Sequence, residues 1–269
     1  MKLNGTLGFL GFGNMGGAIL RGLLKAETLA VEQAWAYDVD AEKCAQAKAL
    51  GVAVAATAAE LAGKSDTLVL AVKPQSMAEA LAQAQPGVSP KTLVISIAAG
   101  ISIGYVQENF GRDVRVVRVM PNTPALVGAG AAGIALSENC TAAAAEVART
   151  IFEAVGVAEM VSESMIDGVT ALSGSGPAYF FYMVECLVAA ATAQGMDEAQ
   201  ATRLAAQTLL GAGRLLKESG EPASVLRERV TSKGGTTAAA LEAFRQGGFD
   251  KVVAAGFDAA AARSKELGK

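Results

Sequence analysis

The amino-acid sequence predicts an α/β protein in which a doubly wound parallel sheet is followed by an all-helical C-terminal domain. Three observations support this fold class. Short runs of branched and aromatic residues alternate with alanine-rich helical stretches as far as about residue 162, which is the pattern of repeated βαβ units. A glycine-rich turn, Gly11-x-Gly13-x-x-Gly16, directly follows the first of these runs. Beyond Met165 the strand pattern disappears, and only helical patterns remain.

The predicted strands follow one another in chain order with a helical stretch between them. Their apolar residues run without interruption, as in Leu68–Val72, which suits strands that are covered on both faces. They are Thr6–Leu10, Ala34–Tyr37, Thr67–Val72, Thr92–Ile97 and Val114–Val119. A helix over Thr141–Val155, with Thr141 as its N-cap, and a last strand near Val157–Val161 complete the sheet domain.

The period of the apolar pattern changes near Ser162–Ser164, and we place the domain boundary there. Residues 1–162 are then the sheet domain, and residues 163–269 are the helical domain. A chain of 269 residues is long enough for two such domains. The helices predicted in the second domain are Pro177–Gln194, Asp197–Glu218, Ala223–Val230, Thr237–Gln246 and Lys251–Leu267.

The helix Pro177–Gln194 contains Glu185 as its only charged residue. A membrane span is one interpretation by length, but the helix has no flanking Lys or Arg and carries that carboxylate near its centre. A helix that is apolar on all sides in a globular protein is buried. We therefore predict a core helix that also packs across a subunit interface, so that the protein is a homo-oligomer and does not enter a membrane.

Composition excludes several classes of function. The net charge is −3 with both signs interspersed, which leaves no basic field for nucleic acid, so we expect small-molecule partners. Cys44, Cys140 and Cys186 are too few and too far apart for a disulfide framework, and the chain start has no long apolar stretch of a signal peptide. A reducing cytoplasm is therefore the expected location. The absence of His excludes a Ser-His-Asp triad and an HExxH zinc site, and no metal site is predicted.

The glycine-rich turn predicts a dinucleotide-binding site of the Rossmann type. It lies between a strand and a helix, which is the context in which the motif is specific. Gly11 allows the tight turn, Gly13 lets the backbone approach a pyrophosphate, and Gly16 permits close packing of helix on strand. Free N–H groups at the helix start meet the phosphate charge, so the predicted cofactor contacts are Gly11, Phe12, Gly13, Asn14, Met15 and Gly16. The alternative is a glycine-rich turn without a ligand.

An acidic residue, Asp38, follows the second strand at the distance where a carboxylate holds the adenosine ribose. A carboxylate there accepts both ribose hydroxyls and repels a 2′-phosphate, so this residue favours NADH over NADPH. The alternative is that Asp38 or Asp40 caps the helix that opens at Ala41. The two roles are compatible, with Asp40 as the cap and Asp38 as the ligand.

Further residues follow later strands at the same edge of the sheet, where ligands of open α/β proteins bind. Val72 and Lys73 follow one strand, Ala99 lies after the next in SIAAG, and Asn122 follows a third in RVMPNTPA. We predict that these four residues contact the cofactor. The alternatives are a solvated surface side chain for Lys73 and helix–sheet packing for SIAAG.

Six segments, in this order and across nearly the whole chain, resemble the family of pyrroline-5-carboxylate reductase, the last enzyme of proline biosynthesis. They are FLGFGNMGGAI, LAVKPQ, ISIAAG, RVMPNTPA, LSGSGPAY and VTSKGGTT. The resemblance implies a Rossmann domain followed by a helical domain that dimerises, often into a ring of dimers. It also implies hydride transfer from NAD(P)H to the C=N carbon of Δ1-pyrroline-5-carboxylate, which yields L-proline.

In this family the loop that matches VTSKGGTT holds the substrate, which accounts for a polar Gly-Gly run between two helical stretches. The resemblance implies substrate contacts from Ser232, Gly234, Gly235, Thr236 and Thr237, and from Ser175 in LSGSGPAY. Thr237 is the catalytic candidate, placed to hydrogen-bond the ring nitrogen or to relay a proton. Missing side chains at the two glycines suit N–H groups that converge on a carboxylate. The alternative is an ordered turn in which Thr236 or Thr237 is only an N-cap.

The chain departs from the family at Asp38, where relatives commonly carry a small polar residue that is associated with NADPH use, so the cofactor is expected as NAD(P)H. Two other classes of function remain. A β-hydroxyacid dehydrogenase would need a catalytic Lys on the helix after the domain boundary, and Pro177–Gln194 has none. A non-catalytic nucleotide-binding module is the other. The lack of His fits an imine substrate, because an iminium enters already protonated and positioning does most of the work.

Overall fold

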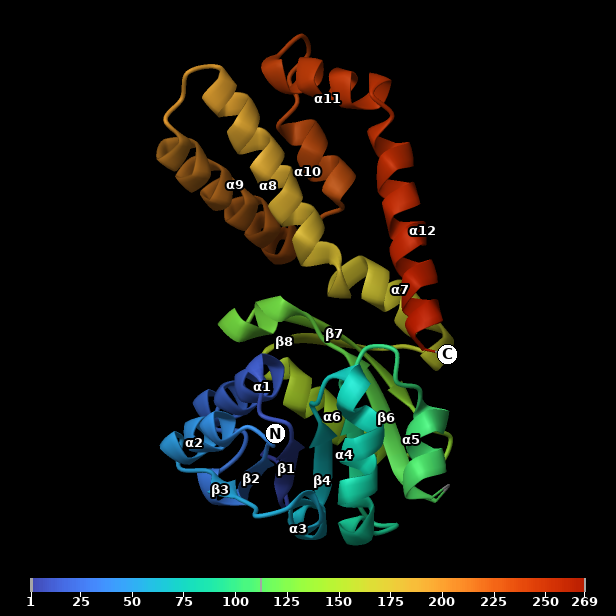
Figure 1. Cartoon of the computed structure of the whole chain (residues 1–269). Coiled ribbons are helices and arrows are strands. Elements are labelled where there is room, and N and C mark those ends of the chain that lie inside the picture. Colours follow the sequence, from blue (N-terminus) through green and yellow to red (C-terminus); the bar gives the residue numbers. More distant parts are fainter. Residues whose placement is uncertain (1, 112, 269) are drawn as a thin grey trace. The chain divides into compact units, whose positions relative to one another are not determined.

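A computed structural model describes residues 2–111 and 113–268, which fold as two compact units (Figure 1). The first, called the sheet unit, extends to Ser175 and includes the end of the chain from Ala260. The second, called the helical unit, comprises Gly176–Ala259.

The sheet unit contains one sheet, which has eight strands in the described part of the chain, in the order β3-β2-β1-β4-β5-β6-β7-β8. Neighbouring strands run parallel, apart from the antiparallel pair β6 and β7. Strand β1 lies between β2 and β4, so the strand order reverses there, and open α/β sheets bind ligands at such a switch point. The strands are Leu7–Leu10 (β1), Ala34–Tyr37 (β2), Ala53–Val54 (β3), Thr67–Leu70 (β4), Leu93–Ser96 (β5), Arg115–Met120 (β6), Gly130–Leu136 (β7) and Gly156–Met160 (β8).

Helices cover both faces of this sheet because successive strand residues point to opposite sides. Phe9 and Val69 pack in a cluster with α1, α2 and α6, whereas Leu10 and Leu70 pack with α3, α4 and α5. The α-helices of the sheet unit are Asn14–Lys25 (α1), Ala41–Ala49 (α2), Ala58–Lys64 (α3), Met77–Ala84 (α4), Ile103–Phe110 (α5), Ala142–Glu153 (α6) and Ile166–Val169 (α7). Short 3-10 turns cover Val31–Gln33, Pro74–Ser76, Gln85–Gly87, Thr123–Val127 and Glu163–Met165, and a π-helical turn covers Thr170–Gly174.

The strands and helices predicted from the sequence are confirmed, with ends that agree within two residues. Thr141 caps α6 as predicted, since its hydroxyl accepts the N–H of Ala144 at 3.3 Å. Two strands lie outside the predictions. Strand β3 has only two residues, and β7, with the sequence GAAGIAL, is rich in Gly and Ala, which have low strand propensity. The antiparallel direction of β7 also departs from the fully parallel sheet that the alternating pattern indicated.

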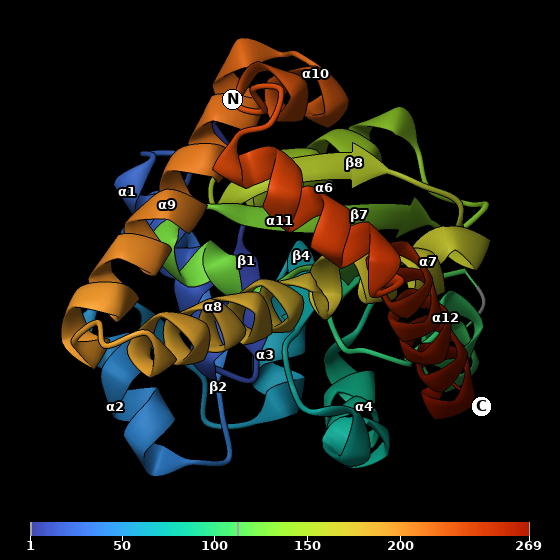
Figure 2. The ribbon, with the colours of Figure 1, turned by 90° about the horizontal axis from the view of Figure 1, so that it is seen from above.

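The helical unit is formed by α8 to α11 and most of α12. Helices α8 and α9 are joined by a short turn (Figure 2) and pack against each other. Gly195, in that turn, has a φ of +92°. The Asp197 side chain caps α9 by accepting the N–H of Gln200 at 3.0 Å. The helices are Gly176–Ala193 (α8), Glu198–Ser219 (α9), Ala223–Arg229 (α10), Thr236–Gln246 (α11) and Phe249–Leu267 (α12).

The prediction that α8 is a core helix is wrong for the single chain. Within the described residues, Gly176 is the only buried residue of this helix, and its aromatic run is exposed, with Tyr182 at 67%. The stretch Glu163–Ala193 is also long and apolar enough to cross a membrane, with a mean hydropathy of 1.2, but apolar helices of soluble proteins share this length and composition. An apolar surface of this size requires cover by a partner.

Candidate cofactor and substrate sites

Each glycine of the Gly11-x-Gly13-x-x-Gly16 turn meets a different steric requirement. Gly11 has a φ of +94°, and a Cβ there would lie 2.8 Å from the carbonyl oxygen of Ala71. A Cβ at Gly16 would lie 2.9 Å from the carbonyl oxygen of Gly11. At Gly13, by contrast, a Cβ would meet no protein atom within 4 Å. Gly11 and Gly16 are therefore required by the protein itself, whereas the space beside Gly13 is open for a ligand to approach the backbone.

The start of α1 supplies hydrogen-bond donors beside that open space. The Gly17 N–H donates to the Gly13 carbonyl at 2.9 Å, so the N–H groups of Asn14, Met15 and Gly16 precede the first intrahelical bond. In the described chain no side chain caps this helix. Free N–H groups and the positive end of the helix dipole favour an anion such as a pyrophosphate. The arrangement therefore fits a dinucleotide.

Asp38 is oriented toward the same turn by backbone donors. Its Oδ2 accepts the Phe12 N–H at 2.6 Å, and its Oδ1 accepts the Asp40 N–H at 2.9 Å. The Asp40 carboxylate accepts the Glu42 N–H at 2.8 Å and caps α2. The predicted division of labour is thus confirmed for the cap. These two bonds hold the Asp38 carboxylate in place. Its oxygens keep further lone pairs, which could accept hydrogen bonds from ribose hydroxyls.

A cavity of about 390 Å³ lies at the carboxyl ends of β1, β2 and β4 and brings several predicted residues together. Gly11, Gly13, Asp38, Val72 and Lys73 all line it. Its remaining wall includes residues that the sequence interpretation did not single out, among them Lys43, Ser76 and Gln83. Their positions in α2, in the turn after β4 and in α4 could have indicated them, because the helices after these strands face the same edge.

Other predicted cofactor residues lie outside this cavity. Phe12 is buried and stacks edge-on against Phe9 at 6.4 Å, so only its backbone faces the turn. The Asn122 amide donates to the Ser173 carbonyl and accepts the Ala131 N–H, each at 2.9 Å. The amide oxygen and the amide nitrogen of Asn122 therefore both make hydrogen bonds within the protein. Met15 packs against the core, and Ala99 is half-buried in the loop after β5.

The loop that follows α10 contains the predicted substrate residues. Gly234 has a φ of +72°, and the Gly235 N–H donates to the Ser232 carbonyl at 3.0 Å, which closes a tight turn. Gly235 is the N-cap of α11, and in the described chain no side chain caps this helix. The alternative in which Thr236 or Thr237 is the N-cap is therefore wrong. The first N–H groups of α11 remain available for an anion, with Thr237 at the second helical position.

Ser175 ends the π-helical turn before α8, and its N–H donates to the Thr170 carbonyl at 2.8 Å. It belongs to the sheet unit, whereas Ser232 to Thr237 belong to the helical unit.

A second hollow, of about 580 Å³, lies along the edge strand β8 beside Arg149 and Glu153. The hydrogen bond from Arg149 to Glu153, followed by the charge of that carboxylate, raises the pKa of Arg149, so this guanidinium stays charged. Among residues 2–111 and 113–268, no three His, Cys, Asp or Glu side chains are grouped to hold a metal ion.

Comparison with known proteins agrees with this geometry. Residues 163–267 match the family described as pyrroline-5-carboxylate reductase dimerisation, and residues 6–100 match NADP oxidoreductase coenzyme F420-dependent. The protein is 41% identical to pyrroline-5-carboxylate reductase of Methanosarcina acetivorans over 99% of both chains. The solved pyrroline-5-carboxylate reductase of Coxiella burnetii is 34% identical, with a TM-score of 0.94 over 99% of this chain and 100% of that one.

A further solved structure, pyrroline carboxylate reductase of Plasmodium falciparum with NADP bound, is 32% identical and has a TM-score of 0.87 over 100% of both chains. The dimerisation match covers the exposed apolar residues of α8, so the helical unit mediates self-association. The chain belongs to the pyrroline-5-carboxylate reductase family.

Proposed function

We propose that this protein reduces Δ1-pyrroline-5-carboxylate to L-proline with NAD(P)H, as the last step of proline biosynthesis. The observation that supports the proposal most is that two helices of the described chain begin without a side-chain cap. One, at α1, stands beside the open space at Gly13, and the other, at α11, carries Thr237. A dinucleotide pyrophosphate and a small carboxylate are the anions that these two sites would take.

In the sheet unit, the chain binds and orients the cofactor. The N–H groups of Asn14, Met15 and Gly16 would hold the pyrophosphate, and the fixed carboxylate of Asp38 would accept the ribose hydroxyls. Lys73, exposed beside the same cavity, adds a positive charge near the phosphates. The bound nicotinamide cofactor supplies the hydride.

In the helical unit, the chain binds the substrate. The turn Ser232–Gly235 and the first N–H groups of α11 would receive the substrate carboxylate, and Ser175 would be a further substrate contact, as the family resemblance implies. The Thr237 hydroxyl would hydrogen-bond the ring nitrogen. When hydride adds to the C=N carbon, the π electrons of that bond move to the nitrogen and neutralise the iminium charge. Because the substrate enters protonated, a hydroxyl or a water is a sufficient partner, and His is not required.

We propose that the active species is a homodimer or a ring of dimers in the cytoplasm, without nucleic-acid or membrane partners. The exposed aromatic run of α8 supports burial against a second copy, as does the exposed Leu204 of α9. Cys44, Cys140 and Cys186 are all free thiols, which suits a reducing compartment. The net charge of −3 offers no basic surface for nucleic acid.

Oxidation of NADH or NADPH, followed in the presence of pyrroline-5-carboxylate, tests the function. We expect turnover with this imine and none with a 3-hydroxy acid run in the reverse direction with NAD(P)⁺. The second substrate tests the β-hydroxyacid dehydrogenase alternative, which already lacks its Lys on α8. Cofactor binding without turnover of either substrate would instead indicate a nucleotide-binding module and contradict the proposal.

Asp38 should make the protein use NADH about tenfold better than NADPH in kcat/KM. A carboxylate beside a 2′-phosphate in a partly solvated site is unfavourable by on the order of 1 kcal/mol or more. Asp38→Asn should remove most of this preference, because the charge is gone while the amide oxygen still accepts the Phe12 N–H, although the bond from the Asp40 N–H is lost. Glu42→Gln is the matched control, since Glu42 bonds to Gln46 and does not line the cavity. Equal or better kcat/KM with NADPH in the unaltered protein would refute this role.

A further inference from the structure

The loop between β5 and α5, Ile97–Ser102, is called the cofactor loop because it carries Ala99. It leaves the carboxyl end of β5, where Ala98 and Gly100 are buried. Gly100 has a φ of +77°, and the Ile101 N–H donates to the Ala98 carbonyl at 3.3 Å. The loop is short and turns sharply, so the segments that contact it beside Ala99 and at its α5 end determine where Ala99 lies.

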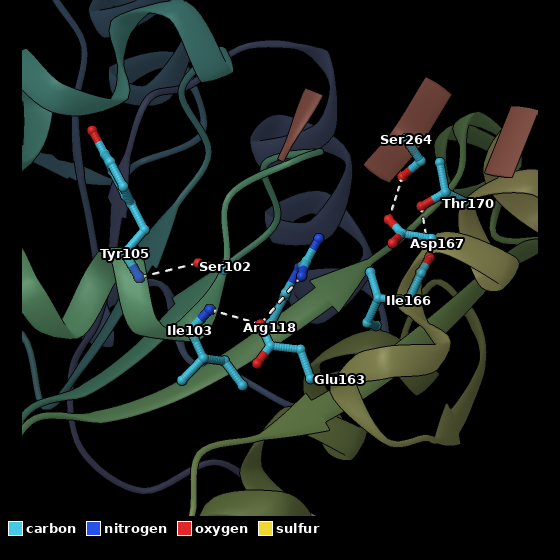
Figure 3. Close-up of polar contacts among 9 residues, drawn as sticks. All are labelled: Ser102, Ile103, Tyr105, Arg118, Glu163, Ile166, Asp167, Thr170 and Ser264. Carbon is cyan, nitrogen blue, oxygen red and sulfur yellow. Dashed lines mark hydrogen bonds and ion pairs between the residues drawn. The ribbon is translucent and has the colours of Figure 1, made fainter. Parts of the chain in front are cut away.

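The end of the cofactor loop that enters α5 is bonded to a distant segment. The Oε1 of Glu163 accepts the Ile103 N–H at 2.8 Å and also pairs with Nη1 of Arg118 at 3.2 Å (Figure 3). Arg118 lies on β6, and its side chain is only 10% exposed. Ser102 caps α5 through the Tyr105 N–H at 3.1 Å. An ion pair with a largely buried Arg118 therefore holds this end in place.

The other contact comes from the end of the chain. The Oγ of Ser264 donates to Oδ1 of Asp167 at 2.7 Å, and Ser264 is 5% exposed (Figure 3). One turn later, the backbone of α12 reaches the cofactor loop. A Cβ at Gly100 would lie 2.7 Å from the Leu267 carbonyl oxygen, and a Cβ at Gly268 would lie 3.2 Å from the Gly100 carbonyl oxygen. Backbone thus meets backbone at a distance that only glycine permits.

The two acidic side chains that make these contacts belong to one short segment. Glu163 and Asp167 are four residues apart, in the 3-10 turn after β8 and in α7. Glu163 holds the far end of the cofactor loop, and Asp167 holds Ser264, whose helix ends against Gly100. Among the described residues, the Ser264–Asp167 bond is the side-chain hydrogen bond that joins the last turn of α12 to the rest of the sheet unit.

We propose that the last turn of α12, Ser264–Gly268, positions the cofactor loop, and that the Ser264–Asp167 hydrogen bond keeps this turn on Gly100. Ser264 and Asp167 are positioning residues and touch neither cofactor nor substrate. The inference rests on the proposed function in one respect, namely that the loop carries the cofactor contact Ala99.

The test is Ser264→Ala, which deletes the hydroxyl with little change in volume. In the cofactor-free protein, hydrogen exchange of the Ile101 and Ile103 amides should become about three- to tenfold faster, as expected for the loss of one hydrogen bond of ordinary net strength. In the enzyme, the KM for NADH should rise by about the same factor, while kcat and the KM for pyrroline-5-carboxylate change less than twofold. Ser264→Thr, which keeps the hydroxyl, should restore both quantities.

Arg263→Ala is the control from the same turn of α12, because Arg263 is exposed and pairs only with Glu266 among the described residues. Asp167→Ala combined with Ser264→Ala should be no worse than Asp167→Ala alone if the two act through one bond. A lower Tm for Ser264→Ala, with unchanged loop exchange and unchanged KM, would show a merely structural contact and overturn the proposal. Absence of turnover in the unaltered protein would instead contradict the proposed function, since the exchange measurement needs no substrate.

Discussion

Gly13→Val should abolish NADH binding while the protein stays folded. The substitution is harmless to the fold because a Cβ at Gly13 meets no protein atom within 4 Å and because its φ of −72° suits any residue. The same side chain would occupy the space through which a pyrophosphate approaches the start of α1. Losing two charge-assisted hydrogen bonds to a phosphate, at about 1.5–3 kcal/mol each, weakens binding by about 10²-fold or more.

Titration calorimetry with NADH, together with a thermal melt, measures both halves of this prediction. Gly13→Ala should give a smaller loss, since the added group is smaller. Gly63→Val is the matched control, because Gly63 is exposed on α3 and a Cβ there has its nearest neighbour at 3.9 Å. Gly11 would be a poor choice, since a φ of +94° and the nearby Ala71 carbonyl would couple cofactor loss to misfolding. Unchanged NADH affinity in Gly13→Val would contradict the assignment of this turn as the pyrophosphate site.

The nucleotide turn was predictable because its requirements are local. The positive φ of Gly11 and the close approach of Gly16 to the Gly11 carbonyl both lie within a single strand–turn–helix segment, and Asp38 follows the adjacent strand β2. Residue spacing reports such requirements directly. The strand β7 was not predictable for the opposite reason. Its residues are mostly Gly and Ala, and its pairing with β6 in antiparallel register supplies the strand geometry that its composition does not.

Two further features depend on partners that a local pattern cannot reveal. The apolar surface of α8 predicts burial, but the surface that covers it is absent from the single chain, so the pattern cannot distinguish a core helix from an interface helix. The bond between Ser264 and Asp167 joins residues 97 positions apart in the chain, and both types are common on protein surfaces. Arg118 is different, because a charge inside the apolar run RVVRVM was a visible sign that an acidic partner, which proves to be Glu163, was required.

The Asn122 amide illustrates a limit of reasoning from position alone. Its place after β6 predicts a cofactor contact, since ligands bind at that edge of the sheet. In the structure its oxygen and nitrogen bond to backbone groups of Ala131 and Ser173, in β7 and in the π-helical turn. A polar side chain at the ligand-binding edge can therefore serve to bond backbone groups of neighbouring segments. A contact between Asn122 and the cofactor stays a prediction.

Thr237→Val should lower kcat by about 10²- to 10⁴-fold if the hydroxyl donates a proton to the ring nitrogen, which is the range expected for a general acid. If the hydroxyl only orients the ring, KM should rise and kcat should fall modestly. The substitution keeps volume and β-branching, so no cavity opens. It also removes no cap, because Gly235 is the N-cap of α11. NADH affinity should be unchanged, since Thr237 lies in the helical unit and the nucleotide turn in the sheet unit.

Steady-state kinetics with pyrroline-5-carboxylate, beside NADH titration of the same variant, separate these outcomes. Thr231→Val is the matched control in the same loop, because that hydroxyl already donates to the Arg227 carbonyl at 2.6 Å and is not free for a ligand. Because it removes this bond, it should disturb the loop at least as much as Thr237→Val does, and it should still leave kcat within a few-fold of the unaltered protein. Thr237→Ser should recover most of the activity, because it retains the hydroxyl. Wild-type kcat and KM in Thr237→Val would remove Thr237 from the site and leave VTSKGGTT as a turn between two helices.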